Sequence, residues 1–332
     1  MENKLEDIGF YTLSDERAEN CSMTSQMKRC ELIILEACNF RCPYCRGLKD
    51  EIYGERRIKQ LSLDEIKKNI DYWCEGEKPL ENIRFSGGEP TLHKNIVDVV
   101  EYAKLKGIKR IAISTNGSNK MFLYKRLVDA GVNDFSISLD ACCAEDGDKM
   151  SGGVKGSWDK VISNIEEISK LTYVTVGVVL TPDNIDNTIE TIRFAHKLGV
   201  ADIRIISAAQ YNQPLPRLNE VEDEILDAHP ILKYRIKHFS EGVNVRGLSE
   251  TDSKKCGIVL DDSIIGGIHH FPCVIYMREK GDPIGMVGPN MRQERKEWHE
   301  THNCLEDKIC KEMCLDVCRD HNNKVSKINK GI

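Results

Sequence analysis

Three cysteines occur within eight residues, at Cys38, Cys42 and Cys45, directly after the apolar run Leu32–Leu35. Three thiolates in one loop can hold three corners of a cubic iron–sulfur cluster and leave the fourth iron open to a ligand that is not protein. The same three thiols also suit a zinc knuckle or ordinary buried positions. The loop is therefore a candidate metal centre whose metal these cysteines alone do not decide.

A pair of glycines and a carboxylate form a second candidate site, in the run Ser86-Gly87-Gly88-Glu89-Pro90. The glycines let a ligand approach the backbone closely, and Glu89 can accept hydrogen bonds from an ammonium group. The run also suits a plain strand-to-helix turn, in which the glycines supply positive φ and Glu89 favours the helix dipole.

Small polar residues lie at or just after the ends of two further predicted strands, at Ser114, Asn116 and Ser138. Ligands of parallel α/β folds sit beyond the carboxyl ends of the strands, so these side chains could meet a ribose or a carboxylate. Each of them alone equally suits N-cap or turn chemistry.

The spacing Cys38-x3-Cys42-x2-Cys45, with Tyr44 before the third cysteine, resembles the signature of the radical S-adenosylmethionine (SAM) superfamily, and the other marks follow in the family's order. The resemblance implies a [4Fe–4S] cluster on the three cysteines and SAM bound to its open iron. It further implies reductive cleavage of SAM to a 5′-deoxyadenosyl radical, which abstracts hydrogen from the substrate. The residues expected to hold SAM are Tyr44, Gly87, Gly88, Glu89, Ser114, Asn116 and Ser138. No catalytic residue and no substrate-binding group can be identified.

Strands and helices alternate from residue 31 to residue 206, which places the chain in the α/β class. Strands are expected at 31–36, 82–85, 109–113, 134–138, 172–180 and 202–206, and helices at 63–75, 92–106, 119–130, 157–169 and 185–198. Such βα units form a parallel sheet covered by helices. The pattern is similar to the partial (βα)6 barrel of the radical SAM family, followed here by a small Cys-rich α+β extension.

The extension carries six cysteines in fewer than eighty residues, and it resembles the SPASM and twitch extensions that hold auxiliary iron–sulfur clusters. A strand pair with a glycine turn is expected at 264–273, followed by another turn at 284–286. The spacing Cys304-x5-Cys310-x3-Cys314 matches the SPASM pattern, but Thr301 stands where its first cysteine would be. A structural zinc ribbon is the alternative, because four thiolates also suit zinc.

The candidate auxiliary ligands are Cys256, Cys273, Cys310, Cys314 and Cys318. Six thiolates cannot fully ligate two four-thiolate clusters, so the options are one such cluster with two spare thiols or a second cluster with incomplete cysteine ligation. We favour one auxiliary [4Fe–4S] cluster on Cys256, Cys273, Cys314 and either Cys310 or Cys318. The five cysteines outside both groups are expected to behave as small buried hydrophobes; they are Cys21, Cys30, Cys74, Cys142 and Cys143.

Three segments follow from this organisation: an N-terminal arm at 1–30, a radical SAM core domain at 31–238 and an auxiliary-cluster domain at 239–332. The arm carries no recognisable motif. The core boundary is expected in the polar stretch after residue 209 or in the helix that follows it.

The amino-acid composition indicates which kinds of binding partner to expect. With 47 Lys and Arg against 53 Asp and Glu, the formal net charge of −6 argues against general nucleic-acid binding. No signal peptide or long apolar segment is predicted, so we expect a cytoplasmic protein with no membrane partner. Fourteen cysteines favour metal or redox chemistry in a reducing compartment. The family resemblance adds an electron donor such as flavodoxin or ferredoxin.

The expected function is hydrogen abstraction from a small-molecule substrate that is thereby oxidised, cyclised or rearranged. The alternatives are a maturase that modifies a ribosomal peptide or protein, and a non-catalytic iron–sulfur or zinc scaffold. Many peptide maturases carry a leader-binding domain of roughly 80 residues ahead of the cysteine loop. We expect no such domain here, which weakens the maturase alternative. Val274 stands where sulfatase maturases place an Asp, and the chain does not end in Gly-Gly as the GTP cyclase does.

Overall fold

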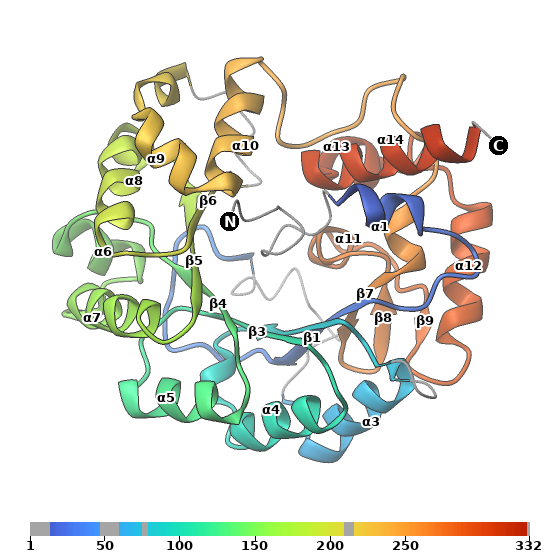
Figure 1. Cartoon of the computed structure of the whole chain (residues 1–332), viewed down its shortest axis with the longest axis horizontal. Coiled ribbons are helices and arrows are strands. Elements are labelled where there is room, and N and C mark those ends of the chain that lie inside the picture. Colours follow the sequence, from blue (N-terminus) through green and yellow to red (C-terminus); the bar gives the residue numbers. More distant parts are fainter. Residues whose placement is uncertain (1–13, 47–59, 75–78, 209–215, 331–332) are drawn as a thin grey trace.

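The computed structural model describes residues 14–46, 60–74, 79–208 and 216–330, and its centre is one curved sheet (Figure 1). The strands are β1 (Arg29–Leu35), β2 (Asn82–Gly87), β3 (Arg110–Thr115), β4 (Asp134–Ser138), β5 (Tyr173–Leu180), β6 (Asp202–Ser207), β7 (Asp262–Gly266), β8 (His269–Phe271) and β9 (Gly285–Met286). Their order is β6-β5-β4-β3-β2-β1-β7-β8-β9. Strands β1 to β7 are parallel, while β8 and β9 are antiparallel to their neighbours.

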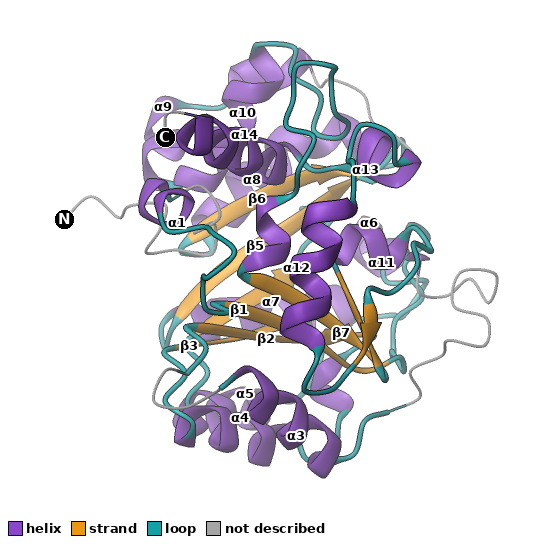
Figure 2. Ribbon diagram, turned by 90° about the vertical axis from the view of Figure 1, so that its right-hand side faces the viewer, coloured by secondary structure: helices purple, strands orange, loops and turns teal. Residues whose placement is uncertain are grey.

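Helices surround the sheet, as Figure 2 shows. They are α1 (Asp15–Glu19), α3 (Leu63–Trp73), α4 (Ile96–Leu105), α5 (Met121–Ala130), α6 (Ala144–Met150), α7 (Ser157–Ser169), α8 (Thr188–Lys197), α9 (Asp223–Ala228), α10 (Pro230–Ser240), α11 (Val274–Arg278), α12 (Met291–Thr301), α13 (Lys308–Met313) and α14 (Asp316–Lys330). Short 3₁₀ turns complete the described elements: η5 (Pro90–Leu92), η6 (Ile185–Asn187), η7 (Pro216–Glu220) and η8 (Gly257–Leu260). No helix in these ranges is long and apolar enough to cross a membrane.

Strand β1 lies in the middle of the sheet and is almost wholly buried. Six of the seven residues of β1 are buried, and the run Leu32–Leu35 packs in the main core with Phe85 and Ile113. A strand buried on both faces has little reason to alternate polar and apolar residues, which is why β1 reads as a continuous apolar run. The expected six parallel strands are confirmed, each within two residues of its predicted range.

The extension does not form a separate sheet. Strand β7 pairs with β1 from Arg29↔Asp262 to Ile33↔Gly266, so the barrel sheet continues into β8 and β9. The strand pair around Gly267, whose φ is +63°, is as expected. The expected turn at 284–286 is wrong in part, because Gly285 and Met286 pair with β8 as β9.

The N-terminal arm packs on the extension where it is described, from residue 14. Helix α1 lies against α14 (Figure 1), and Ala18 and Cys21 share a small core with Val259, Leu260 and Val325. Residues 1–13 of the arm lie outside the described residues. The arm, core and extension therefore share packed interfaces, and the limits 1–30, 31–238 and 239–332 stay a prediction.

Candidate functional site

The three-cysteine loop follows β1 and is fixed at its far side by a buried hydrogen bond. Tyr44 donates its hydroxyl proton to the carboxylate of Asp140, which also accepts the Val179 N–H at 2.7 Å. Burial, with Asp140 second, raises the pKa of Tyr44 well above its usual value. Tyr44 therefore ties the loop to the ends of β4 and β5, a structural role that the motif itself did not reveal.

The three thiols lie close enough to influence one another. Burial, followed by negative charge on Asp140, Cys45 and Cys38, raises the pKa of Cys42 to about 12. Burial also raises the pKa of Cys38, whose Sγ accepts the Phe40 N–H at 3.4 Å. Raised pKa values keep Cys38 and Cys42 protonated unless a cation displaces their protons, so the site suits a metal that binds thiolates.

The Gly-Gly-Glu run lies beside the chain that leads into the cysteine loop. Gly88 N–H donates to Leu35 O at 2.9 Å and Glu89 N–H donates to Ala37 O at 2.8 Å. Gly87 has a φ of +142°, and a Cβ at Gly88 would overlap the main-chain oxygens of Glu36 and Ala37. The glycines thus allow the close backbone approach that holds the loop in place.

Glu89 is fully buried, and its carboxylate accepts hydrogen bonds from four protein groups. Oε1 accepts from Thr91 N–H, Thr91 Oγ1 and Thr115 Oγ1, at 3.0, 2.6 and 2.7 Å, and Oε2 accepts the Asn116 N–H at 2.6 Å. Burial raises the pKa of Glu89 despite these bonds. Through these hydrogen bonds the Glu89 carboxylate joins the end of β2 to the end of β3. Its contact with an ammonium group stays a prediction.

A cleft at the carboxyl ends of β3 and β4 brings part of the predicted set together. Its lining includes Cys42, Asn116, Ser138 and Asp140. The Asn116 amide also lies 3.9 Å from Cys38 Sγ. Ser114 lies further back, where its hydroxyl accepts a hydrogen bond from Arg84 at 3.0 Å. Asp140 is the residue of this cleft that sequence reasoning missed.

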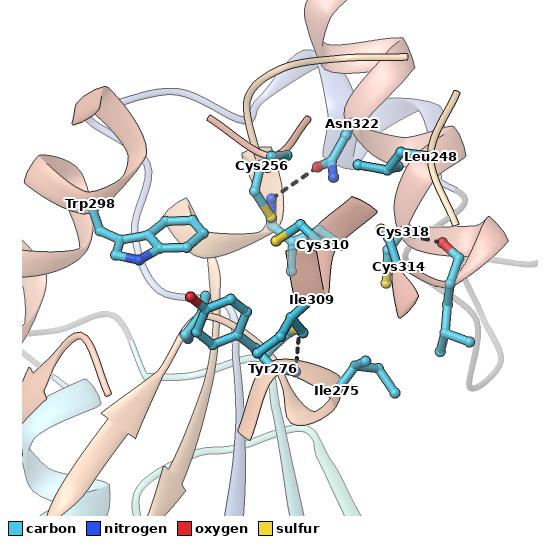
Figure 3. Close-up of a pocket in the computed structure, with 15 residues that line it drawn as sticks. Leu248, Cys256, Ile275, Tyr276, Trp298, Ile309, Cys310, Cys314, Cys318 and Asn322 are labelled. Atoms are coloured by element: carbon cyan, nitrogen blue, oxygen red, sulfur yellow. Dashed lines mark hydrogen bonds between the residues drawn. The ribbon is translucent and has the colours of Figure 1, made fainter. Parts of the chain in front are cut away.

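The six cysteines of the extension surround one cavity of about 40 Å³. Figure 3 labels Cys256, Cys310, Cys314 and Cys318 around this cavity, together with Trp298, Tyr276 and Asn322. The thiols come from the loop before η8, the N-cap of α11, the segment between α12 and α13, and helices α13 and α14: Cys256, Cys273, Cys304, Cys310, Cys314 and Cys318. Cys304, which was left out of the predicted ligand set, lines the cavity with the other five.

Within this ring, Cys304 and Cys310 form a pair. The Cys310 thiol and His302 lower the pKa of Cys304 to about 6, while the same contact and burial raise the pKa of Cys310. His302 Nε2 lies 3.6 Å from Cys310 Sγ. Of the five remaining cysteines, Cys21 and Cys30 are buried as expected, whereas Cys143 is exposed because it precedes α6 at the surface.

Comparison with curated proteins finds relatives named GTP 3′,8-cyclase. The protein from Tolumonas auensis is 27% identical over 54% of this chain and 52% of its own length. The one from Synechococcus elongatus is 33% identical over 47% of each chain. This chain thus spans about half the length of the curated relatives it matches. A Caenorhabditis elegans protein, named molybdenum cofactor biosynthesis protein moc-5, is 28% identical over 67% of this chain and 36% of its own.

Solved structures share the fold over most of the chain. Streptococcus suis SuiB bound to its precursor peptide SuiA superposes with a TM-score of 0.60 at 14% identity, covering 93% of this chain and 79% of SuiB. Native anSMEcpe with bound AdoMet gives a TM-score of 0.58 at 15% identity, with coverage of 91% and 95%. Residues 32–195 match the family model of the Radical SAM superfamily, and this segment of the chain is therefore a radical SAM domain.

Proposed function

We propose that this chain is a radical SAM enzyme that abstracts hydrogen from a small, negatively charged substrate. The observation that carries the proposal is the thiol loop Cys38–Cys45 at the carboxyl end of β1, beside the cleft at the ends of β3 and β4. A [4Fe–4S] cluster on these thiols, with SAM bound, would supply one-electron reduction and a carbon-centred radical.

The chain's own residues would orient SAM around the loop. The approach of Gly87 and Gly88 to the backbone of residues 35–37 leaves this edge without side chains, which suits the amino end of SAM. Asn116 and Ser138, in or beside the cleft, offer an amide and a hydroxyl for the ribose and carboxylate. Glu89 contributes by fixing the Asn116 backbone.

Two arginines on one face of the sheet, the buried Arg84 and the half-buried Arg204, support an anionic substrate. Arg84 donates hydrogen bonds to the Ser114 hydroxyl and, at 3.4 Å, to the Asp134 carboxylate. Arg204 Nη2 donates to Ser136 Oγ at 3.2 Å. These contacts join β2 to β4 and β4 to β6, so the side chains share one face of the sheet. In the described ranges Arg204 has no carboxylate within ion-pair distance, and burial, with Arg84 and Arg235, lowers its pKa to about 10. A bound carboxylate or phosphate would relieve this repulsion.

The test is anaerobic 5′-deoxyadenosine production under dithionite, first without substrate and then with GTP and other phosphorylated or carboxylated metabolites. Wild type should cleave SAM slowly alone and faster with one of the anions. Arg204→Gln should keep the slow rate and lose most of the stimulation. If no 5′-deoxyadenosine forms, the chain is a scaffold; if only peptides stimulate it, it is a maturase. A flavodoxin or ferredoxin as electron donor and a cytoplasmic location complete the proposal.

The extension is proposed to hold one auxiliary [4Fe–4S] cluster on four of its thiols. Its six cysteines meet in one cavity, and a cluster of this kind takes four. The limits of the core and extension at residues 238 and 239 are part of the same proposal, since this boundary separates the two cysteine groups.

A further inference from the structure

The cavity of the extension holds more donors than one cluster can use. Six thiols line it, and His302 lies beside two of them. His302, Cys304 and Cys310 offer ligand atoms that all lie within 4.8 Å of one another, and they are the one such group found among the described residues. Removing Cys304 and Cys310 from the six leaves four thiols, the number that one cubic cluster needs.

The spacing of this triad is that of ligands on a single metal ion. A tetrahedral ion with a metal–sulfur bond of about 2.3 Å and a metal–nitrogen bond of about 2.0 Å places its sulfur and nitrogen ligands about 3.5 Å apart. The distance between Cys310 Sγ and His302 Nε2 is 3.6 Å. Thiolates of a cubic cluster bind different irons, so they stand further apart than two ligands of one ion.

Neighbouring groups hold the imidazole with Nε2 toward the thiols. The ring stacks on Trp298, with centroids 3.9 Å apart and an interplanar angle of 15°. Lys255 Nζ donates to the His302 carbonyl at 3.0 Å. Such partners, beyond the ligands themselves, commonly orient metal-binding imidazoles.

Asp307 adds a negative charge and fixes one of the thiols. Its Oδ2 lies 3.9 Å from His302 Nε2, and its Oδ1 accepts the Cys310 N–H at 2.8 Å. The same Oδ2 accepts the Tyr276 hydroxyl at 2.9 Å, so Asp307 is held beside the triad and its negative charge favours a dication there.

We propose that Cys304, Cys310 and His302 bind one zinc ion, next to an auxiliary cluster held by Cys256, Cys273, Cys314 and Cys318. Two thiolates and one imidazole in tetrahedral spacing are a donor set that suits zinc. The assignment rests on the proposed function only in giving the other four thiols to a cluster. Zinc content and SAM cleavage are measured separately, so failure of one is distinguishable from failure of the other.

The experiment is metal analysis of the full chain after anaerobic purification and reconstitution with iron and sulfide. We expect one zinc per wild-type chain, and X-ray absorption at the zinc edge should show two sulfurs near roughly 2.3 Å and at least one nitrogen near roughly 2.0 Å. His302→Ala should lower zinc occupancy about tenfold with iron unchanged, and Cys304→Ser should act in the same direction.

Matched controls use the same residue types away from the triad: His269→Ala on β8, and Cys143→Ala at the surface. Both should keep zinc and iron at wild-type levels. Loss of zinc in Cys256→Ala but not in His302→Ala would place zinc in the four-thiolate site and overturn the proposal. So would wild type with no zinc and about twelve irons, because that content means three clusters. The absorption spectrum of wild type tests the assignment even if a variant fails to fold.

Discussion

Gly88 has no room for a side chain, and what blocks it is backbone rather than a movable group. A Cβ there would overlap the oxygens of Glu36 and Ala37, just ahead of Cys38. The glycine pair was predicted as a place where a ligand approaches the backbone. In the structure the chain's own segment already makes such an approach, and the expected contact with SAM is a further use of the same edge.

Gly88→Ala should therefore displace the segment that carries Cys38. We expect loss of about four irons per chain, those of the N-terminal cluster, and a fall of about 1–3 kcal/mol in the free energy of unfolding. Iron analysis and denaturant unfolding measure the two effects. Gly288→Ala is the matched control, because a Cβ there meets its nearest atom, Met286 O, at 4.0 Å. Wild-type iron content in Gly88→Ala would show that the loop tolerates the shift.

Helices α8 and α10 meet through a pair of histidines. His196 Nδ1 lies 3.0 Å from His229 Nε2, and His229 is almost fully buried. Burial, with His196 as a smaller cause, lowers the pKa of His229 to about 4. Because the unfolded chain binds this proton near pH 6.5, the stabilisation by neutral His229 is present above pH 6.5 and is lost as the pH falls toward 4.

His229→Asn should flatten the pH dependence of stability in this window. The difference between wild type and variant should shrink by up to about 1.4 kcal/mol per pH unit, less where solvent screens the charge. Chemical denaturation at pH 7, 6 and 5 measures it. Burial raises the pKa of Asp202 to about 7, so this residue makes the protein more stable as the pH falls, opposite to His229. Because Asp202 is present in both proteins, the difference between their free energies of unfolding isolates the effect of His229. Parallel curves for both proteins would mean that His229 does not titrate as stated.

Local sequence patterns predicted the strands and helices that adjoin the cysteine, glycine and strand-end motifs. They missed helices and turns that have no hydrophobic periodicity of their own. The predicted helix 92–106 is in fact η5 followed by α4, because Glu89 caps a short turn through its bond to Thr91 N–H. Helix α6 has little apolar periodicity and contains Gly147, so no signal marked it. His302 stands alone in the sequence. It became a candidate ligand only through the fold of α12 and α13, which brings it against Cys310.

At the scale of the molecule, a buried ion pair fastens the N-terminal arm to the extension. Arg17 Nε and Nη2 donate to Asp261 at 2.8 and 2.6 Å, with both side chains almost fully buried. The main-chain carbonyl oxygen of Asp261 accepts the backbone N–H groups of Lys28 and Arg29 as β1 begins. No local pattern predicts this pairing, since its partners are 244 residues apart.

Arg17→Met should cost about 3–5 kcal/mol of stability, because it leaves the Asp261 charge buried without its partner. Lys324→Met is the control: Lys324 of α14 pairs with Asp15 of α1 and so also joins the arm to the extension, but both side chains are exposed, so the expected loss is below about 1 kcal/mol. Thermal and denaturant unfolding compare the two. Equal losses of stability in the two variants would show that the buried ion pair contributes no more to stability than the exposed one.

The pairing of β1 with β7 constrains how such a protein can be recombined. An extension taken from another chain would need a first strand that fits the edge Arg29–Ile33 in the same register, because a shift of one residue turns every side chain of that strand to the opposite face. The extension and the β1 edge of the barrel sheet must therefore match each other in sequence. A chimera that replaced the chain only beyond residue 208 would leave that edge mismatched.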